Sequence, residues 1–504
     1  MQYPGYLCCT DLLGADESSD RHHCNERDVM TTDSPAAAET ARGGLLERHT
    51  IGPVPAADRN GTGWGLFGIW LGVSMLPLTV VTGALATAVF GLSFWWAVTA
   101  VLVGNVFGGI FMGLHASQGP ELGVPQMLQA RGQFGARGAA FVVVVALVMF
   151  MGFFVSNVVV GAQAIHQVVP SISVNTGIWL AVAISLVISA VGLRLIKILV
   201  SFWAVVIGIL GAASFVWIIA DGIPSGALSA GSFTSAGFFS MVAVGAVWQI
   251  AFAPYVSDFS RYMPSKTGVR GAFWGTYGGS VLSGSLMMTL GALVGALSAE
   301  ADAMSGLDGL LGGFGPTVLF CFALASASTN AGNIYCAMLN ALTLIETFVR
   351  GWLPGVRGRL IATIALHVLG LGMSILGQGS FLTNFTNFIT LLLYVLIPWS
   401  AINLVDYFLV KHGDYDVDSF FAADGGIYGQ WNTTALAVYA VGIVVQIPFA
   451  VTPSFTGPFA EDLGGVDVAW CAGLLVSGVL YYVLARRTVV SSPAPTLTEE
   501  LVNR

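Results

Sequence analysis

The sequence contains few charged residues. Asp, Glu, Lys and Arg make up 9% of its 504 residues, whereas soluble domains carry about 25%. The mean hydropathy is +0.79, and 55% of the residues are hydrophobic. Many stretches of roughly 20 residues carry no charge, which is the length of a bilayer-spanning helix. The composition excludes a soluble domain, and the continuous apolar runs exclude a membrane barrel, whose strands alternate apolar and polar residues.

The apolar stretches also lack the groups that hydrolytic and proton-relaying sites use. No Asp, Glu, Lys or Arg lies well inside an expected span, since Asp258, Glu346 and Asp406 fall near span ends. The chain contains neither HExxH nor GxSxG, and His367 stands alone in its span. The six cysteines show no metal-ligand spacing. These absences disfavour an enzyme, a metal centre and a proton relay through buried carboxylates.

The two ends of the chain are polar. Residues 1–62 contain no apolar segment, so the sequence predicts no signal peptide. We expect residues 1–62 to form a disordered cytoplasmic tail, residues 63–487 a twelve-helix membrane domain, and residues 488–504 a C-terminal cytoplasmic tail. Met30 offers an alternative start of translation, which N-terminal sequencing or intact mass would decide.

Apolar spans follow one another from Trp64 onward. We expect twelve, at about residues 64–90, 94–115, 138–167, 175–193, 197–220, 237–256, 272–298, 314–345, 357–377, 383–410, 432–452 and 466–485. Lys and Arg occur between spans 2 and 3, 4 and 5, 6 and 7, and 8 and 9, after span 10, and in the tails. The alternate connections, such as HQVVPSISVNTG, contain none. Because basic loops stay in the cytoplasm, this predicts a multi-pass cell-membrane protein with both termini cytoplasmic.

The first and sixth spans contain residues that break helices. Span 1 carries Gly72, Ser74 and Pro77, and span 6 carries Gly245 and Pro254, with a tryptophan at a similar distance before each proline. An inverted five-plus-five repeat places broken helices at these two positions, around a site at mid-membrane depth. The alternative is that these residues mark ordinary kinks or close packing.

The polar side chains at depth are amides and hydroxyls, and aromatic rings accompany them. Phe153 and Asn157 in span 3 are four residues apart and share a helix face, as do Trp248 and Phe252 in span 6. Span 8 carries the run STNAGN. Amides and rings suit a flat neutral heterocycle, and hydroxyls with carbonyls of a broken helix suit sodium. The alternative is that these groups hold helices together.

Five motifs in order carry a resemblance to a known family. They are ERHTIGPVPAADR before span 1, QGPELGVPQMLQARGQFGARG after span 2, APYVSDFSRYMP after span 6, STNAGNIYCAMLNAL in span 8 and AINLVDYFLVKHGDY after span 10. With them the chain resembles the nucleobase–cation symporters, which include purine–cytosine, allantoin and hydantoin permeases, and most of all the purine–cytosine branch. The resemblance implies the leucine-transporter fold: two inverted five-helix repeats, two extra helices and alternating access.

The resemblance also implies two sets of site residues. For the substrate they are Phe153, Asn157, Trp248, Phe252, Asn330 and Asn333. For a coupling cation they are backbone carbonyls at Gly72, Val73 and Leu76 and the hydroxyls of Ser328 and Thr329. The family often has tryptophan at the position of Phe153. Because of this difference, the resemblance does not identify which exact substrate this chain binds. Some members are proton-coupled, and the lack of buried carboxylates favours sodium.

The prediction is a symporter that imports a neutral nucleobase or related heterocycle with sodium or protons. It has no cofactor, no nucleic-acid partner and no covalent chemistry; its partners are the substrate, the ion and the bilayer. Asp258 and Arg261, three residues apart after span 6, are expected to form an exposed pair at the inner gate. The alternatives are an amino-acid permease on the same fold and a ligand sensor without flux.

Overall fold

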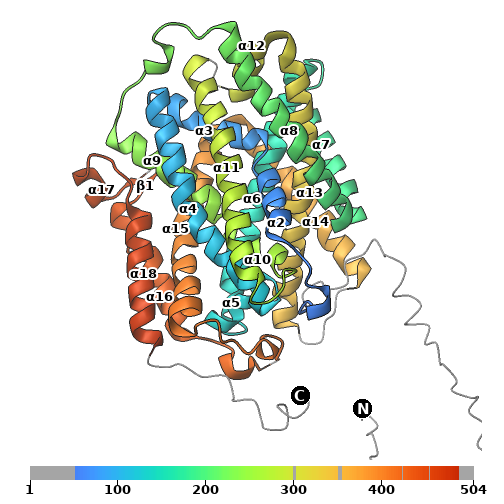
Figure 1. Ribbon diagram of the computed structural model, residues 1–504, viewed down its shortest axis with the longest axis vertical. Coiled ribbons are helices and arrows are strands. Elements are labelled where there is room, and N and C mark those ends of the chain that lie inside the picture. Colours follow the sequence, from blue (N-terminus) through green and yellow to red (C-terminus); the bar gives the residue numbers. More distant parts are fainter. Residues whose placement is uncertain (1–51, 299–301, 350–354, 423, 453–454, 487–504) are drawn as a thin grey trace, which may run out of the picture. The chain divides into compact units, whose positions relative to one another are not determined.

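The computed structural model describes residues 52–298, 302–349, 355–422, 424–452 and 455–486, and these form helices almost throughout (Figure 1). The helices are α2 (Gly63–Val73), α3 (Pro77–Ala88), α4 (Phe94–Leu122), α5 (Gln126–Phe134), α6 (Ala139–Val168), α7 (Val174–Val191), α8 (Leu193–Asp221), α9 (Ser235–Ile250), α10 (Ala253–Ser260), α11 (Gly268–Leu297), α12 (Ala303–Leu311), α13 (Gly315–Phe348), α14 (Val356–Gly377), α15 (Phe381–Val405), α16 (Thr433–Val444), α17 (Pro458–Asp462) and α18 (Ala469–Ala485). A π-helical turn, η6 (Asp406–Val410), follows α15, and strands β1 (Val451–Thr452) and β2 (Phe455–Thr456) pair antiparallel.

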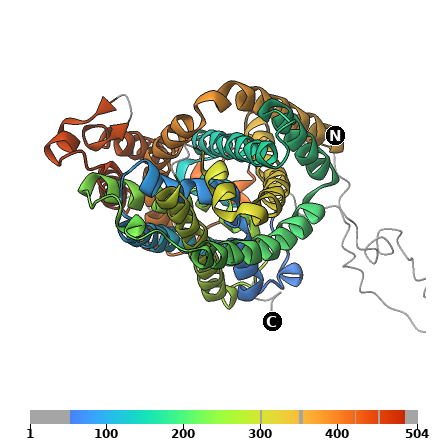
Figure 2. The same ribbon diagram turned by 90° about the horizontal axis from the view of Figure 1, so that it is seen from above.

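Each expected span has a helical counterpart in the described chain. Eight segments are long and apolar enough to cross a membrane, and the bent pair α2–α3 makes nine. One of the eight, residues 356–410, contains both α14 and α15. The last two spans correspond to shorter apolar helices, Thr433–Phe449 and Ala469–Ala485. Figures 1 and 2 show α16 and α18 together at one flank of the other long helices.

Two groups of helices stand out among the interhelical contacts, and α15 and α16 pack on α18 apart from them. In the first, α11 packs on α2, α3 and α4, and α4 packs on α9. In the second, α13 packs on α6, α7, α8 and α14. Each group pairs helices that occupy equivalent positions in the two halves of the chain: α2–α3 with α9–α10 and α4 with α11, then α6 with α13 and α7 with α14. This is the grouping that an inverted five-plus-five repeat predicts.

Glycines allow the helices of the first group to pack backbone to backbone. A Cβ atom on Gly83 would lie 2.0 Å from the carbonyl oxygen of Met288, and one on Gly291 would lie 1.8 Å from that of Val80. Both glycines therefore let α3 and α11 approach closer than any side chain would permit. Small residues serve the same purpose in many membrane helix pairs.

The last part of the expected N-terminal tail has a defined position. Arg59 Nε donates to the Val54 carbonyl at 2.8 Å and Nη1 donates to the Pro120 carbonyl at 2.8 Å. The Val54 amide in turn donates to the Gly123 carbonyl at 3.0 Å. Residues 52–62 thus lie against the end of α4, which differs from the expected disorder because Arg59 supplies donors for carbonyls at a helix end. Residues 1–51 lie outside the described part of the chain.

Candidate functional site

The first span is broken where the sequence places its Gly, Ser and Pro. Helices α2 and α3 meet at a bend of 63°, across the non-helical residues 74–76. Leu76 is extended, with φ −141° and ψ 150°, and Pro77 opens α3. Proline is well placed there because the first turn of a helix needs no amide hydrogen from it. The break leaves backbone carbonyls at mid-span outside the regular helical ladder.

The sixth span is interrupted more gently than expected. Ala251 and Phe252 form a turn between α9 and α10, and Pro254 lies in the first turn of α10. The two helices together still form one continuous apolar segment, residues 235–260. Both residues of the turn keep right-handed helical angles, so the chain direction changes little. Only the first span is sharply broken among the described residues.

A cavity of about 260 Å³ lies beside both interruptions. Its walls come from α2, α3, α6, α8, α9, α10 and α13 and from Leu76 in the break. Rings dominate the lining: Phe150, Phe153, Trp248, Phe252, Tyr255, Phe259 and Tyr335. The polar lining residues are Asn157, Lys197, Ser201, Thr329 and Asn333. An apolar, ring-lined pocket with a few polar groups is typical of a small-molecule site.

The rings on α6 and α9 form one corner of the cavity. The Phe153 and Trp248 rings pack edge to face, with centroids 5.8 Å apart, and Trp248 packs in the same way against Phe252 at 6.2 Å. Phe388 of α15 packs against the other side of Phe153 at 5.3 Å. The Trp248 Nε1 atom donates to Ser74 Oγ at 3.2 Å. This bond ties the aromatic corner to the break between α2 and α3.

The predicted substrate residues lie together, with one exception. Phe153, Asn157, Trp248, Phe252 and Asn333 all line the cavity. Asn157 is 2% exposed, and its Oδ1 atom accepts no hydrogen bond from any described residue. An acceptor buried in this way costs free energy unless water or a ligand donates to it.

Asn330 lies apart from the other predicted substrate residues. It is fully buried and does not line the cavity. Its Nδ2 atom donates to the Phe154 carbonyl at 3.3 Å, and its Oδ1 atom accepts from Asn333 Nδ2 at 3.2 Å. Asn330 therefore holds α13 against α6 and orients Asn333, which is the amide that reaches the cavity from α13.

The residues predicted to bind the cation are likewise divided: some line the cavity and others do not. Val73, Leu76 and Thr329 line the cavity, whereas Gly72 and Ser328 do not. Gly72 packs against α8, where a Cβ atom would meet Ala204 Cβ at 2.6 Å. Ser328 Oγ donates to the Leu324 carbonyl at 2.9 Å and accepts from Trp203 Nε1 at 3.1 Å. One acceptor lone pair of Ser328 remains after these two bonds.

Sequence reasoning missed several residues of the site. Tyr255, Phe259 and Tyr335 line the cavity, and Ser74 supports it through Trp248. Tyr255 and Phe259 lie three and seven residues beyond Phe252, at the spacing that keeps them on one helix face across the turn. That helical periodicity is the signal in the sequence for these two rings.

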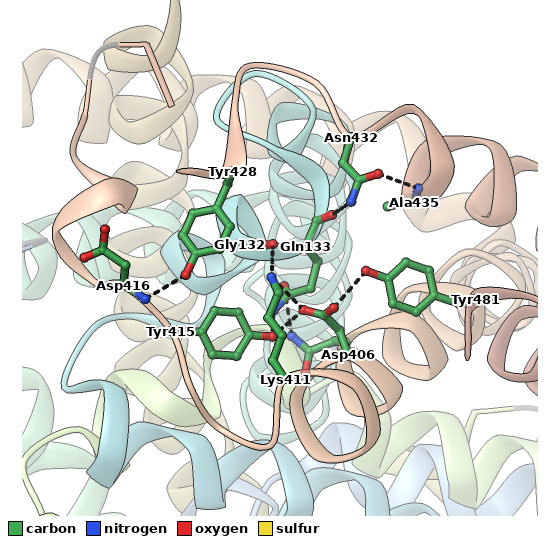
Figure 3. Close-up of polar contacts among 11 residues, drawn as sticks. Gly132, Gln133, Asp406, Lys411, Tyr415, Asp416, Tyr428, Asn432, Ala435 and Tyr481 are labelled. Atoms are coloured by element: carbon green, nitrogen blue, oxygen red, sulfur yellow. Dashed lines mark hydrogen bonds and ion pairs between the residues drawn. The ribbon is translucent and has the colours of Figure 1, made fainter. Parts of the chain in front are cut away.

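Figure 3 shows a second buried polar cluster, around Asp406 and Lys411. It lies at the end of the helices where Arg131 and Arg261 are also found, which we call the basic end. Asp406 is 1% exposed; Tyr481 donates to its Oδ1 atom at 2.9 Å, and Tyr415 donates to Oδ2. Lys411 Nζ lies 3.3 Å from the same oxygen. Burial lowers the pKa of Lys411, although the Asp406 carboxylate opposes that shift. The expectation that Asp406 sits near a helix end holds, but the carboxylate is buried and not in contact with water.

Side-chain amides connect this cluster to α10. The hydrogen-bonded series runs from Tyr415 through Gln133, Asn403, Gln118 and Gln126 to Ser257. All six side chains are buried. Because each bond joins a different pair of positions on α4, α5, α10, α15 and the following loop, a large displacement of α10 relative to α15 requires some of them to break.

Asp258 and Arg261 are not an exposed pair. Arg261 is 2% exposed, and its guanidinium donates to the carbonyls of Asp258 at 3.3 Å and Gly52 at 3.4 Å and stacks near the Tyr262 ring at 5.1 Å. Asp258 Oδ1 accepts from the Gln126 amide at 2.9 Å. The expectation of an exposed pair is wrong because the Arg261 side chain is buried and bonds to the Gly52 carbonyl. The carboxylate instead caps the first turn of α5, where negative charge is favourable.

Most of the chain resembles proteins already known. Residues 53–473 match the model of a family described as permeases for cytosine and purines, uracil, thiamine and allantoin. The chain is 36% identical over 446 residues to YxlA of Bacillus subtilis, which is named as a purine-cytosine permease; the match covers 88% of this chain and 96% of that protein.

The fold resembles that of Mhp1 in two solved states. The inward-facing conformation of Mhp1 gives a TM-score of 0.73 at 19% identity and covers 91% of this chain and 98% of the other. The closed conformation, described as a nucleobase-cation-symport-1 family transporter with bromovinylhydantoin bound, gives 0.71 at 21% identity and covers 88% and 96%. At such identities the likeness shows the fold alone, and it confirms the leucine-transporter fold expected from the sequence.

Proposed function

The chain belongs to the family of permeases for cytosine and purines, uracil, thiamine and allantoin, and we propose that it imports a neutral nucleobase or related heterocycle together with a cation. It is a membrane transporter for nucleobase-like substrates and not an enzyme. The exact substrate, the coupling ion, the residues of the site and the cytoplasmic placement of the basic end are parts of the proposal.

One observation carries the proposal: Asn157 lines a cavity rich in aromatic rings, and its buried carboxamide oxygen accepts no hydrogen bond from the residues that the structure describes. A nucleobase offers flat faces for the rings and N–H donors for an amide oxygen. The rings of Phe153 and Trp248 provide surfaces for stacking at one corner. In this proposal, Asn157 from α6 and Asn333 from α13 form hydrogen bonds with the edge of the heterocycle. Asn330 is a positioning residue, because it accepts a hydrogen bond from Asn333.

The cation is proposed to bind beside the substrate, at the break. Val73 is the last residue of α2, Leu76 lies in the break, and Thr329 lines the same cavity from α13. Ser328 contributes its remaining lone pair only if α13 and the break approach one another, because its other contacts are with Leu324 and Trp203. Carbonyls and hydroxyls of this kind coordinate sodium without a carboxylate.

The state of the cavity supports transport by alternating access. The lining on α9 and α10 runs from Trp248 to Phe259, toward the basic end, and Lys197 lines the cavity from the start of α8. We therefore assign this conformation to the inward-facing side of the cycle. Asp258 and Arg261 lie at the end of α10 beyond Phe259, so we keep them as residues of the inner gate, acting through α5 and the Gly52 carbonyl.

The test is uptake into proteoliposomes that contain the purified protein. We expect labelled cytosine to accumulate above its external concentration when a sodium gradient points inward, with competition by purines, uracil, allantoin or hydantoins ranking the substrates. If uptake is unchanged without sodium at constant pH but stops when the proton gradient is dissipated, protons are the coupling ion.

Two other results would overturn the proposal. Binding of cytosine without accumulation under either gradient would indicate a sensor. Accumulation of amino acids, with none of any heterocycle, would indicate an amino-acid permease.

A further inference from the structure

A second cavity, of about 330 Å³, lies beyond the first toward the opposite end of the helices. Its walls come from α3, α6, α11, α12 and the start of α15, with the short helix η5 (Gln378–Ser380). Figure 1 shows α12 at the end opposite to α5 and α10. We call the two spaces the outer cavity and the central cavity; no residue lines both.

The two cavities are arranged in sequence along the same helices. On α6, Asn157 lines the central cavity and Gln163 lines the outer one. Six residues of helix separate them, a rise of about 9 Å. On α3, Leu78 lines the central cavity and Val81 the outer one. On α15, Phe381 lines the outer cavity, and Phe388, two turns further along, packs behind Phe153.

The outer cavity repeats the chemistry of the central one. The Gln163 Oε1 atom is buried and accepts no hydrogen bond from any residue that the structure describes. An aromatic ring, Phe381, is present as well, and it stacks on Phe385 with centroids 5.7 Å apart and an angle of 11°. A carboxamide side chain and an aromatic side chain therefore line the same cavity. A volume near the lower end of the range for ligand pockets, about 300 Å³, suits a one- or two-ring heterocycle.

Two neighbouring glutamines donate hydrogen bonds to other helices through their amide nitrogens. Gln378 Nε2 donates to Asn175 Oδ1 at 2.5 Å and to the Ile375 carbonyl at 3.1 Å. Gln167, one turn beyond Gln163 on α6, donates to Ser305. These two amides hold helices together. Gln163 lines the cavity, and its buried Oε1 atom has no donor among the described residues, which costs about 1–3 kcal/mol.

We propose that the outer cavity is a second binding site for a flat, neutral heterocycle whose ring N–H group donates to Gln163 Oε1. The inference rests on the proposed function, because it assigns to this cavity the substrate class of the central one. Asp302 also lines the outer cavity and caps the start of α12, with its Oδ1 atom 3.0 Å from the Met304 amide. Its carboxylate disfavours anionic heterocycles there. The site thus selects neutral molecules before they reach Asn157.

The test uses one cysteine reporter in each cavity of the full chain. Cys336 lines the central cavity, and Thr383→Cys places a thiol in the lining of the outer one. Alkylation of each thiol is followed by peptide mass spectrometry, with and without cytosine, in four backgrounds: no further change, Asn157→Leu, Gln163→Leu and Gln167→Leu. At a cytosine concentration about ten times the dissociation constant, mass action predicts about tenfold slower alkylation of an occupied site.

We expect cytosine to protect position 383 both in the Asn157→Leu background and without it. Gln163→Leu should abolish protection at position 383 and keep it at Cys336, and the matched control Gln167→Leu should keep both. Equilibrium dialysis of the protein without the reporter should give two bound cytosines, and one after Gln163→Leu.

Two results would overturn the outer site and leave the proposed function intact. One is loss of protection at position 383 in Asn157→Leu, which would trace the effect to the central cavity. The other is a single bound cytosine that Gln163→Leu does not change. Absence of cytosine binding at either reporter and in dialysis would overturn the proposed function together with this inference.

Discussion

The sharpest prediction concerns Asn157→Leu. Leucine has the same branched arrangement of four side-chain heavy atoms as asparagine, so the substitution removes the carboxamide from the central cavity and keeps the shape of the side chain. The Oδ1 atom has no donor among the described residues. The substitution therefore breaks no hydrogen bond to Oδ1 from the described part of the chain. It does remove the acceptor that we assign to the substrate.

The expected size of the effect follows from the burial of that oxygen. A substrate N–H group that enters the cavity of Asn157→Leu loses its partner after leaving water. The cost of a buried donor without an acceptor is about 1–3 kcal/mol. At about 1.4 kcal/mol for each factor of ten, the dissociation constant should rise by a factor of about 5 to 150. The free energy of unfolding should fall little, because Asn157 Oδ1 is itself an unsatisfied acceptor.

The assay pairs cytosine binding with thermal denaturation, and Gln249→Leu is the matched control. Gln249 is fully buried, does not line the cavity, and donates to Asn105 Oδ1 at 2.7 Å and to the Ser280 carbonyl at 3.2 Å. Its loss should lower stability by about 0.5–2 kcal/mol and leave affinity unchanged. If Asn157→Leu instead lowers stability while binding stays at the wild-type level, Asn157 is a structural residue and the substrate site is elsewhere.

Three further substitutions test other parts of the molecule. Gly83→Ala should lower the midpoint of thermal denaturation, because the new Cβ atom would lie 2.0 Å from the Met288 carbonyl oxygen; an unchanged midpoint would contradict the close packing of α3 and α11. Asp406→Asn should destabilise the protein by about 3–5 kcal/mol, since Lys411 keeps its burial and loses its counter-charge. Burial already lowers the pKa of Lys411 below its value in the unfolded chain. The loss of stability in the variant should therefore be complete at low pH, where Lys411 is charged, and should shrink as the pH rises through the folded pKa and the amine loses its proton. Thermal denaturation of the variant between about pH 6 and about pH 9 checks that its stability rises with pH. Asp258→Asn keeps an acceptor for the amide at the start of α5 but removes the charge, so the rate of uptake should change more than the dissociation constant; an unchanged rate would exclude a role in the gate.

Local features of the sequence predicted much of the candidate site. Phe153 and Asn157 line one cavity because four residues of helix return a side chain to the same face. Trp248 and Phe252 follow the same rule. The break in the first span was predictable because Pro77 supplies no amide hydrogen to a preceding turn. In each case the cause lies within a few residues of the effect.

Contacts between distant segments were beyond the reach of such reasoning. Whether Asn330 or Asn333 faces the cavity depends on where α6 packs against α13, and the Phe154 carbonyl decides it. The burial of Asp406 depends on Tyr481, 75 residues further along the chain. The burial of Arg261 likewise depends on the segment near Gly52, 209 residues earlier. Spacing along one helix contains no information about these partners.

The bond between Trp248 and Ser74 suggests how substrate and cation are coupled in the proposed cycle. The indole ring of Trp248 lines the central cavity, while its Nε1 atom holds Ser74 between Val73 and Leu76, whose neighbourhood we assign to the cation. A heterocycle that stacks on the ring stabilises one position of the indole. Through the hydrogen bond, that position of the indole also stabilises one position of Ser74 in the break. A cation that orders the break favours the same position of Ser74 and therefore of the ring. Because coupling between two ligands is reciprocal in free energy, each should raise the affinity for the other by the same factor. Trp248→Phe keeps a ring and removes the donor, so cytosine should still bind, but the dependence of its dissociation constant on sodium should be lost; an unchanged dependence would show that the coupling runs through other contacts.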